Sequence, residues 1–436
     1  MSGIRHNARN TTYVVVMTLA LGVCPVWAQE GSQEQAPDKS QSQEVAQESS
    51  QEEPQEKSHF LYWDQGLHFD WKELSLRIAG SVQNDSAGFA NVTDELVEKV
   101  GPIESGVEWR RARLLAEGDF FDRIDWKFQY DFAISNPPQL KDAYMGIRLP
   151  NFGLGEMHFR GGRFKAPLSL EGNTSAVNTT FMERGVVAAF FPARNTGFLL
   201  AGTTDRLRHK IHWNIGAIQP EDELGSTATD NLGVAGRFTY AFEPGGRDDV
   251  GIHAGIDFTR RNVSDTMNYL SRPESHLAPS FVDTGDIAAN GANTANLETA
   301  VIKGPLSVQG EFAWAQVQTT DGSADPGFYA FYIFTSYFLT GERRPYDLDL
   351  GAFGPIVPHS EFMGPAGGAG AFELALRFSR IDLTDEEIDG GVMNNLTGAF
   401  NWYATRNARV LTNVIRSRVE GFDPVWIFQV RLQWAY

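Results

Sequence analysis

A period-two alternation of apolar and polar residues constrains the fold of this chain more than any other feature. The last twelve residues read VWIFQVRLQWAY. One parity holds the apolar residues Trp426, Phe428, Val430, Leu432, Trp434 and Tyr436, and the other holds Gln429, Arg431 and Gln433. Such a period predicts a β-strand with two unlike faces. Because aromatic rings with a polar tip favour a membrane–water boundary, we predict a strand whose apolar face meets lipid.

About sixteen segments of this kind follow one another from Phe60 to the C-terminus. We expect strands near 73–83, 107–119, 124–133, 141–149, 155–163, 196–204, 209–218, 231–242, 250–259, 295–303, 305–317, 328–339, 370–379, 391–403, 408–419 and 425–436. Some connections are tight, as at 121–123 and 303–305. Others are long, namely 84–106, 164–195, 260–294 and 340–369.

This pattern predicts an all-β protein, an antiparallel transmembrane β-barrel with short periplasmic turns and long external loops. Lipid offers no hydrogen-bond partner to an open sheet edge, so the ring must close. About sixteen strands leave a water-filled lumen. The segment 328–339 is apolar on both faces, which either contact with another subunit or a plugged lumen would explain. The alternative of a soluble β-protein, such as a propeller, explains neither the aromatic C-terminus nor the N-terminal segment.

Composition excludes other classes. The chain has 436 residues, and after residue 28 no stretch approaches the 18 or so uninterrupted apolar residues that a membrane-spanning helix needs. The formal net charge of -18 argues against a nucleic-acid partner. The sequences GxSxG, GxxxxGK[ST] and HExxH are missing, so we predict no enzyme and no cofactor. His253 and Asp257 share a strand face, but two ligands do not define a metal site.

The first 58 residues differ from the rest. Residues 1–28 have a basic start, an apolar stretch of about twelve residues and small residues before Gln29, which predicts a signal peptide cleaved after Ala28. Cys24 offers an alternative as a lipid-bearing cysteine, although the valine before it fits poorly. Residues 29–58 hold eight acids, two lysines and many glutamines and serines. We predict a disordered periplasmic tail, either a tether or a plain solvated segment.

Several stretches of the remaining chain, 59–436, resemble one known family. These are VEWRRARLLAEGDFFDRIDWKFQYDF, GEMHFRGGRFKAPLSLE, MERG at 182–185, LTGERRPY at 339–346, GAFELALRFSRIDL and GAFNWYATRNARVLTN. Together they are similar to the phosphate-selective porin O and P family over roughly Gly66 to Tyr436. The resemblance implies a trimeric porin of the outer membrane, a third long loop folded into the lumen, and basic residues that guide anions.

Basic residues on the inward parity give an independent reason to expect anions. An anion that leaves water needs donors and positive charge in return, and arginine suits oxyanions. Parity turns Lys127 and Arg160 inward, and places Arg111 and Arg113 on one face with Glu117. Arg110 falls on the lipid parity, which is tolerable near the rim or where a bulge turns it inward. Three further candidates lie at or within the loop 164–195: Arg163, Lys165 and Arg184.

By resemblance, Arg110, Arg111, Lys127, Arg163 and Arg184 match basic positions along the family's permeation path, and Arg272 matches one position of an arginine-rich stretch. The chain departs from the family at other points. Residues 269–271 are Tyr-Leu-Ser, Glu274 follows, Glu171-Gly172 stands where a lysine is expected, and Ser81 replaces an arginine. This chain therefore has fewer basic residues along the expected permeation path than the family pattern implies.

These observations predict a passive outer-membrane channel for small hydrophilic solutes that favours anions such as phosphate, surrounded by lipid and assembled as a homotrimer. Two alternatives remain open: a general porin with weak ion selectivity, and a structural barrel whose tail tethers the outer membrane.

Overall fold

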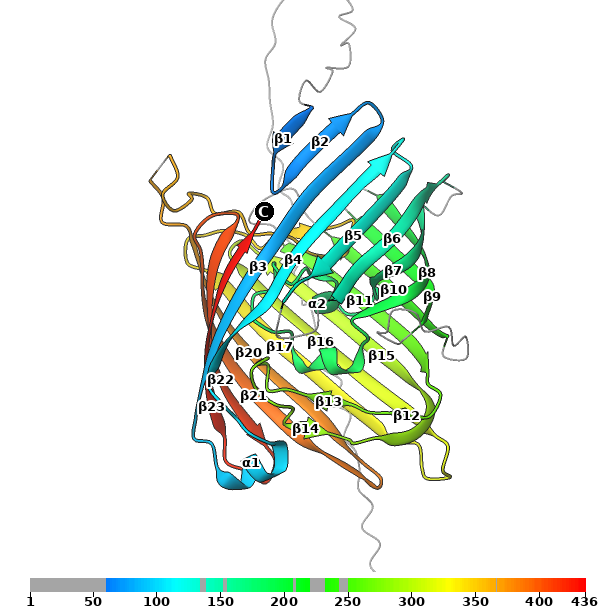
Figure 1. The fold of residues 1–436 in the computed structure, drawn as a ribbon, viewed down its shortest axis with the longest axis vertical. Coiled ribbons are helices and arrows are strands. Elements are labelled where there is room, and N and C mark those ends of the chain that lie inside the picture. Colours follow the sequence, from blue (N-terminus) through cyan, green and yellow to red (C-terminus); the bar gives the residue numbers. More distant parts are fainter. Residues whose placement is uncertain are drawn as a thin grey trace, which may run out of the picture. The chain divides into compact units, whose positions relative to one another are not determined.

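In the computed structural model the described residues are 60–133, 139–151, 155–206, 209–219, 232–242, 250–365 and 367–436 (Figure 1). The predicted signal peptide and acidic tail lie outside them. The described residues all belong to one compact unit, Lys57–Tyr436. Among them, no helix has the length and apolar character needed to cross a bilayer.

Sixteen antiparallel strands form a closed ring, in which the last strand pairs with the first. The strands are β3 (Leu74–Ala90), β4 (Gly106–Phe120), β5 (Ile124–Asp131), β6 (Gln139–Leu149), β7 (Glu156–Lys165), β8 (Arg194–Arg206), β9 (His209–Gln219), β10 (Gly233–Phe242), β11 (Val250–Asn262), β15 (Ile287–Lys303), β16 (Leu306–Thr319), β17 (Gly327–Phe338), β20 (Ala371–Asp385), β21 (Ile388–Tyr403), β22 (Ala408–Val419) and β23 (Val425–Ala435). The register of β23 on β3 pairs Trp434 with Val82 and Trp426 with Ala90. The predicted barrel is therefore confirmed.

Each of the sixteen predicted segments corresponds to one strand of the ring, but several strands extend further toward the long loops. Residues 84–90 were assigned to a loop and instead continue β3 between β4 and β23. β15 begins at Ile287 rather than near 295. The extensions are rich in Asn, Gly and Ala, which are poor strand formers, so pairing with neighbouring strands determines them.

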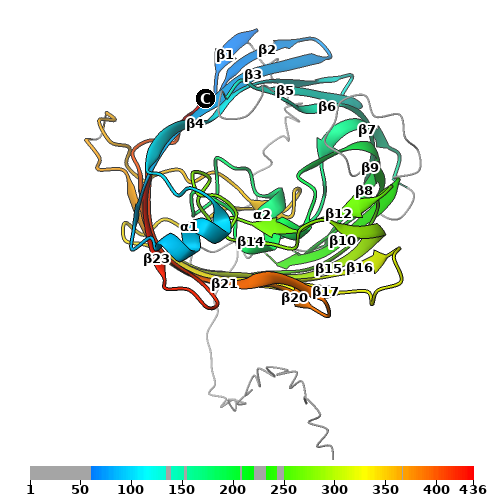
Figure 2. The ribbon, with the colours of Figure 1, turned by 60° about the horizontal axis from the view of Figure 1, so that its bottom comes forward.

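Two short strands at the N-terminal side were not predicted. β1 (Leu61–Trp63) pairs with β2 (Leu67–Trp71), and β2 pairs with the start of β3 outside the span that β23 covers. The hairpin therefore continues the sheet beyond the ring (Figure 2). Trp63 stacks on Tyr436 with 5.9 Å between ring centroids, which ties this hairpin to the end of the chain.

Three connections on one rim carry most of the remaining structure. The connection after β3 holds α1 (Asp94–Val100). The connection after β7, residues 166–193, holds α2 (Leu170–Asn173) and the 3-10 helix η1 (Val186–Phe190), and is called L3 below. The connection after β11, residues 263–286, holds β12 (Thr266–Met267), β13 (Leu270–Ser271) and β14 (Val282–Asp283), and is called L5. Elements of L3 and L5 lie inside the ring of strands (Figure 2).

The opposite rim carries the tight turns at 121–123 and 304–305, together with one long connection. Residues 339–370 follow β17, which runs toward this rim, and contain β18 (Tyr346–Asp347) and β19 (Ala352–Phe353). Phe353 packs with Leu170 of α2 in one apolar cluster. A segment from the rim of short turns therefore meets L3 inside the barrel.

The inner face of β17 explains why its sequence is apolar on both sides. Phe328 and Phe334 on this face are 0% and 2% exposed. Phe181 of L3 meets Phe334 edge-on, with 5.3 Å between ring centroids, and Phe190 joins the same cluster. The sequence left two explanations for this segment, contact with another subunit or a plugged lumen. The packing of L3 on the inner face of β17 corresponds to a plugged lumen at this strand.

Candidate functional site

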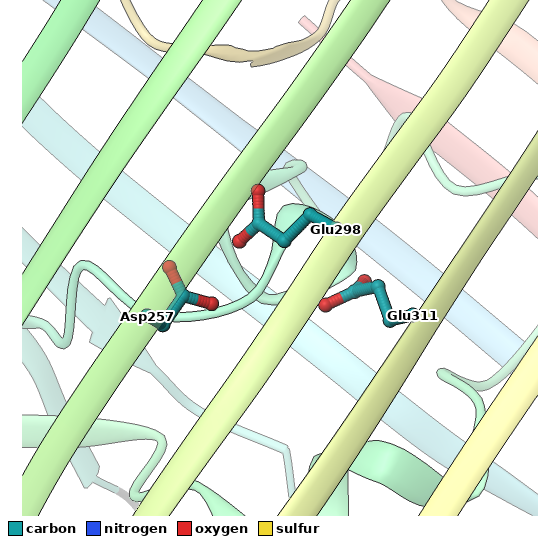
Figure 3. A group of neighbouring side chains, drawn as sticks. All are labelled: Asp257, Glu298 and Glu311. Atoms are coloured by element: carbon teal, nitrogen blue, oxygen red, sulfur yellow. The ribbon is translucent and has the colours of Figure 1, made fainter. Parts of the chain in front are cut away.

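Buried carboxylates of the barrel wall hold one end of L3. Three acidic side chains point toward one another (Figure 3): Asp257 on β11, Glu298 on β15 and Glu311 on β16. One carboxylate oxygen from each lies within 4.8 Å of those from the other two. Arg237 supplies positive charge, with Nη2 2.7 Å from a Glu298 oxygen and Nε 3.4 Å from Asp257. Asn296 Nδ2 donates to Asp257 and Glu311 at 2.7 and 3.0 Å.

The first turn of α2 supplies further donors to these carboxylates. Ser169 has a left-handed φ of 67°, which reverses the chain before the helix. The backbone N–H of Ser169 donates to Asp257 at 2.9 Å, and those of Leu170 and Glu171 donate to Glu311 at 3.1 and 2.8 Å. Because these N–H groups have no partner inside the helix, the acidic group anchors L3.

Glu183 anchors the other arm of L3. Arg110 donates to both of its carboxylate oxygens at 2.9 Å, and Arg431 lies 2.6 Å away. A bulge in the β3–β4 pairing skips Arg110, so the structure turns this residue inward although its parity is outward. Burial alone raises the pKa of Glu183, but the surrounding guanidinium groups hold that pKa well below its ordinary value.

With L3 held against one side, a cavity of about 630 Å³ remains along the inner wall of β3 to β9. We call it the inner cavity. The segment 339–370 contributes Phe353 to its lining, and Arg344 stacks on that ring at 3.5 Å. Its ionisable lining includes Arg77, Arg111, Arg113, Lys127, Arg160, Lys165, Arg184, Arg194, Arg406, Arg409, Asp142, Glu156, Asp347 and Asp349.

Some of these cations have a carboxylate partner. Arg113 Nε lies 2.7 Å from Asp131, and Lys127 Nζ lies 2.7 Å from Glu117. Arg160 stacks on the Tyr144 ring at 4.0 Å. Arg194 likewise lies 3.1 Å from Asp142, and Arg160 lies 3.8 Å from Asp125. Pairing of this kind cancels much of the field that a single charge produces in the lumen.

Other basic side chains in the lining form hydrogen bonds mainly to carbonyl or amide oxygens. Arg184 donates to the carbonyl oxygens of Glu171 and Thr174 at 2.8 and 3.0 Å. Lys165 lies 3.4 Å from the carbonyls of Asn173 and Thr174. Arg409 donates to the Thr179 carbonyl and to Gln433 Oε1, each at 2.9 Å, and Arg111 donates to Gln83 Oε1 at 2.6 Å, with Glu183 at 3.8 Å.

A second cavity of about 260 Å³ lies between L3 and L5, and we call it the outer cavity. Arg184 lines both cavities. Arg272 lines the outer cavity and donates to the carbonyl oxygen of His276. Arg184 is therefore the residue that the linings of the two cavities share.

L5 is held in the barrel by an acid where the family resemblance led us to expect arginine. Glu274 is 3% exposed and lies 2.6 Å from Arg377 Nη2. Its carboxylate also accepts from Ser379 and Thr397 at 2.7 and 2.9 Å. Glu274 therefore compensates a barrel arginine and leaves Arg272 as the basic residue of L5 in the outer cavity.

The nine predicted residues divide into four groups. Arg111, Arg113, Lys127, Arg160, Lys165 and Arg184 line the inner cavity, and Arg272 lines the outer one. Arg110 lies behind them as a partner of Glu183. Arg163 lies on the register row of Ala143 and Thr196, whose parity is outward, and its Nε donates to the Leu140 carbonyl at 3.1 Å.

The sequence analysis missed four arginines of the lining: Arg77, Arg194, Arg406 and Arg409. Parity could have found two of them. Arg409 shares its parity with the inward residues Leu411 and Asn413, and Arg77 shares its parity with the buried residues Ala79 and Ser81 of the same predicted strand. Arg194 has the opposite parity from the inward Leu199, and Arg406 lies in the turn between β21 and β22, so parity could have found neither of them.

A closed sixteen-stranded barrel whose lumen is narrowed by inward loops defines a porin of the bacterial outer membrane. The chain belongs to the family described as "Phosphate-selective porin O and P", whose family model matches residues 77–423. Porin O of Pseudomonas aeruginosa (strain PAO1) is 22% identical over 406 residues, covering 84% of this chain and 89% of that protein. An uncharacterised protein of Caulobacter vibrioides is 26% identical over 386 residues, covering 83% and 72%.

Solved structures share the fold at low sequence identity. OmpT of Vibrio cholerae superposes with a TM-score of 0.52 at 9% identity, covering 84% of this chain and 99% of that chain. OprB of Pseudomonas putida, in its high-pH structure, gives a TM-score of 0.51 at 9% identity, covering 83% and 94%.

Proposed function

We propose that this porin lets small hydrophilic solutes diffuse passively across the outer membrane and favours anions, with phosphate or a similar oxyanion as the candidate solute. One observation carries the proposal. Lys165, Arg184 and Arg409 line the inner cavity and, among the described residues, direct their hydrogen bonds to carbonyl or amide oxygens.

Three basic side chains that have no carboxylate partner among the described residues suit an anion that has lost part of its hydration. The planar guanidinium of Arg184 can donate to two oxygens of one phosphate, and Lys165 contributes a point charge. Arg184 also lines both cavities, which supports a place for it on the path of the solute. The name of the matching family supports the same solute class.

A general porin of weak selectivity is the second candidate. The pairs Arg113–Asp131, Lys127–Glu117 and Arg194–Asp142 reduce the net charge of the wall. The chain also has Glu274 and Ser81 where the resemblance led us to expect arginine. These features favour weaker discrimination than a fully basic wall would give.

Chloride current through single channels in a planar bilayer separates the candidates. We expect phosphate, added at constant chloride, to block the current in a saturable manner, because it competes for Arg184 and Lys165. Arg184→Gln is expected to weaken the block several-fold, whereas Lys303→Gln, an outward-facing change on β15, leaves it unchanged. A linear response to phosphate supports the general porin, and no conductance at all supports a structural barrel.

We also propose that the protein is a homotrimer. The outward residues of β3 include Asn84, Ser86 and Gly88, while the facing positions of β23 are Leu432, Val430 and Phe428. Polar and small residues are unfavourable against hydrocarbon but suit a close contact between copies. The exterior of β3 is therefore our candidate for the contact.

Two further proposals concern the N-terminal segment and catalysis. We propose that residues 1–28 are a signal peptide cleaved after Ala28 and that the protein catalyses no reaction. Support for the first is the basic start and short apolar stretch. N-terminal sequencing of protein purified from outer membranes tests it: a start at Gln29 is expected, and a start at Met1 or at Cys24 contradicts it.

A further inference from the structure

The exterior of the barrel near the rim of L3 and L5 carries two arginines that no part of the described protein satisfies. Arg416 and Arg418 lie on β22, where the outward residues alternate with the buried Ile415, Ser417 and Val419. Arg418 is exposed and Arg416 is partly buried. Neither guanidinium group has a hydrogen bond or ion pair to any of the described residues.

Other outward arginines near the same rim show that this lack of partners is not general. Arg260 on β11 donates to the side-chain oxygens of Asn262, Gln318 and Asn290. Arg380 on β20 donates to Tyr329, to Asn394 and to Asp382 at 3.1 to 3.2 Å. An arginine left without such partners at a membrane boundary requires an external anion or water.

The surroundings of Arg416 and Arg418 favour a lipid as the source of that anion. The register places Leu396 and Trp426 on either side of Arg416. Further toward the membrane interior, the outward residues Val414 and Phe428 face each other and are 41% and 52% exposed. Acyl chains can cover this apolar surface while a headgroup reaches the arginines.

The spacing of the two arginines fits one phosphate group. Residues two apart on a strand point to the same side and lie about 7 Å apart along it. Long guanidinium side chains can converge over that distance on one oxyanion and bind it bidentately. Glu420, the next residue on this side, lies beyond the end of β22, so it borders the pair rather than neutralising it.

We propose that Arg416 and Arg418 bind the phosphate of an anionic glycolipid in the outer leaflet, with its acyl chains against Leu396, Val414 and Phe428. The proposal rests on the outer-membrane location of the barrel and is independent of anion passage through its lumen. Anionic headgroups attract basic residues at a membrane surface, which gives the charge complementarity.

Native mass spectrometry of the detergent-purified full-length protein tests this proposal. The probes are diphosphorylated lipid A and the same lipid with its phosphates removed. We expect the double variant R416Q/R418Q to bind phosphorylated lipid A about tenfold more weakly, which corresponds to about 1.4 kcal/mol. The matched control R260Q/R380Q removes the same number of outward charges and is expected to bind within twofold of the wild type.

Three results would overturn the proposal. They are unchanged binding by R416Q/R418Q, equal binding of the dephosphorylated lipid, and full displacement of lipid A by millimolar inorganic phosphate, which would identify a free-phosphate site instead. Heat-modifiable gel mobility shows that each variant barrel is folded. If R416Q/R418Q loses lipid only because the oligomer dissociates, the masses show it directly, and a contact between copies replaces the lipid.

Discussion

A basic residue in the wall of a channel affects ion preference only as far as its charge is not already matched. In this barrel the distinction can be made residue by residue. Arg113 has Asp131 at 2.7 Å, whereas Arg184 donates to backbone carbonyls. The sequence predicted both residues as members of one group, and only the contacts separate them.

Arg184→Gln is expected to reduce the anion preference of the channel clearly, since it removes a charge that lines both cavities and has no carboxylate partner in the described part of the chain. Arg113→Gln is expected to change the preference in the same direction, because Asp131 is then left uncompensated. Reversal potentials in a salt gradient measure both. If Arg184→Gln behaves like the wild type, Arg184 does not lie on the path.

Asp142→Asn should act in the opposite direction. Asp142 lines the inner cavity and lies 3.1 Å from Arg194, so its neutralisation leaves the positive charge of Arg194 unmatched. We expect a stronger preference for anions than in the wild type, by the same reversal-potential measurement. A shift toward cations would mean that the paired residues do not set the field in the lumen.

At the scale of elements, L3 decides where the passage lies, and two acidic anchors decide where L3 lies. Glu311 fixes the start of α2 and Glu183 fixes the chain ten or so residues later. The apolar packing of Phe181 and Phe190 against β17 completes the attachment. The polar wall of β4 to β9 is left free as a result.

Glu311→Ala is expected to loosen this attachment. It leaves the N–H groups of Leu170 and Glu171 without an acceptor, at a cost of about 1–3 kcal/mol for each buried group. We expect faster proteolysis within residues 166–193 and noisier single-channel current, while the barrel itself stays folded. Glu117→Ala, which lies on the other wall, serves as the control. Equal protease resistance in wild type and Glu311→Ala would contradict the role of this anchor.

The strands could be predicted from the sequence because lipid outside and water inside impose a period of two on each of them. The strand extensions could not, since residues 84–90 and 287–294 pair through the backbone and carry no such pattern. The contacts that attach L3 to the barrel wall could not be predicted from the sequence either. Asp257, Glu298 and Glu311 lie on three different strands, and only the register brings their carboxylates together.

The candidate site was predictable to the extent that it depends on parity. Six of the nine predicted basic residues line the inner cavity: Arg111, Arg113, Lys127 and Arg160 were predicted from strand parity, and Lys165 and Arg184 from their place at or within the long loop after β7. Arg163 is different: it follows Gly162, whose φ of 128° belongs to an irregular stretch at the end of β7. Arg409 was overlooked, although its parity is inward, because its partners in L3 are distant in sequence.

At the scale of the whole molecule, the exterior is not uniform. Most strands present leucine, phenylalanine or tryptophan to the outside, whereas β3 presents Asn84, Ser86 and Gly88. This difference supports the proposed contact between copies at the β3 exterior. The exterior of β22 near the long loops, with Arg416 and Arg418, is a separate feature and points to lipid.

Ser86→Trp is expected to weaken the trimer, because a bulky side chain prevents close approach at the β3 exterior. Native mass spectrometry or unheated gel electrophoresis should show more monomer than in the wild type. Val301→Trp, an outward change on β15 on a different part of the barrel, provides the control. A trimer that persists in Ser86→Trp would place the contact elsewhere.

Positive charge in the lumen that no carboxylate compensates is expected to make this porin favour anions. The reversal potential of the wild-type channel in a potassium chloride gradient measures that preference. We expect a potential with the sign set by chloride, reduced in magnitude in Arg184→Gln. A potential near zero, or one with the sign set by potassium, would contradict it.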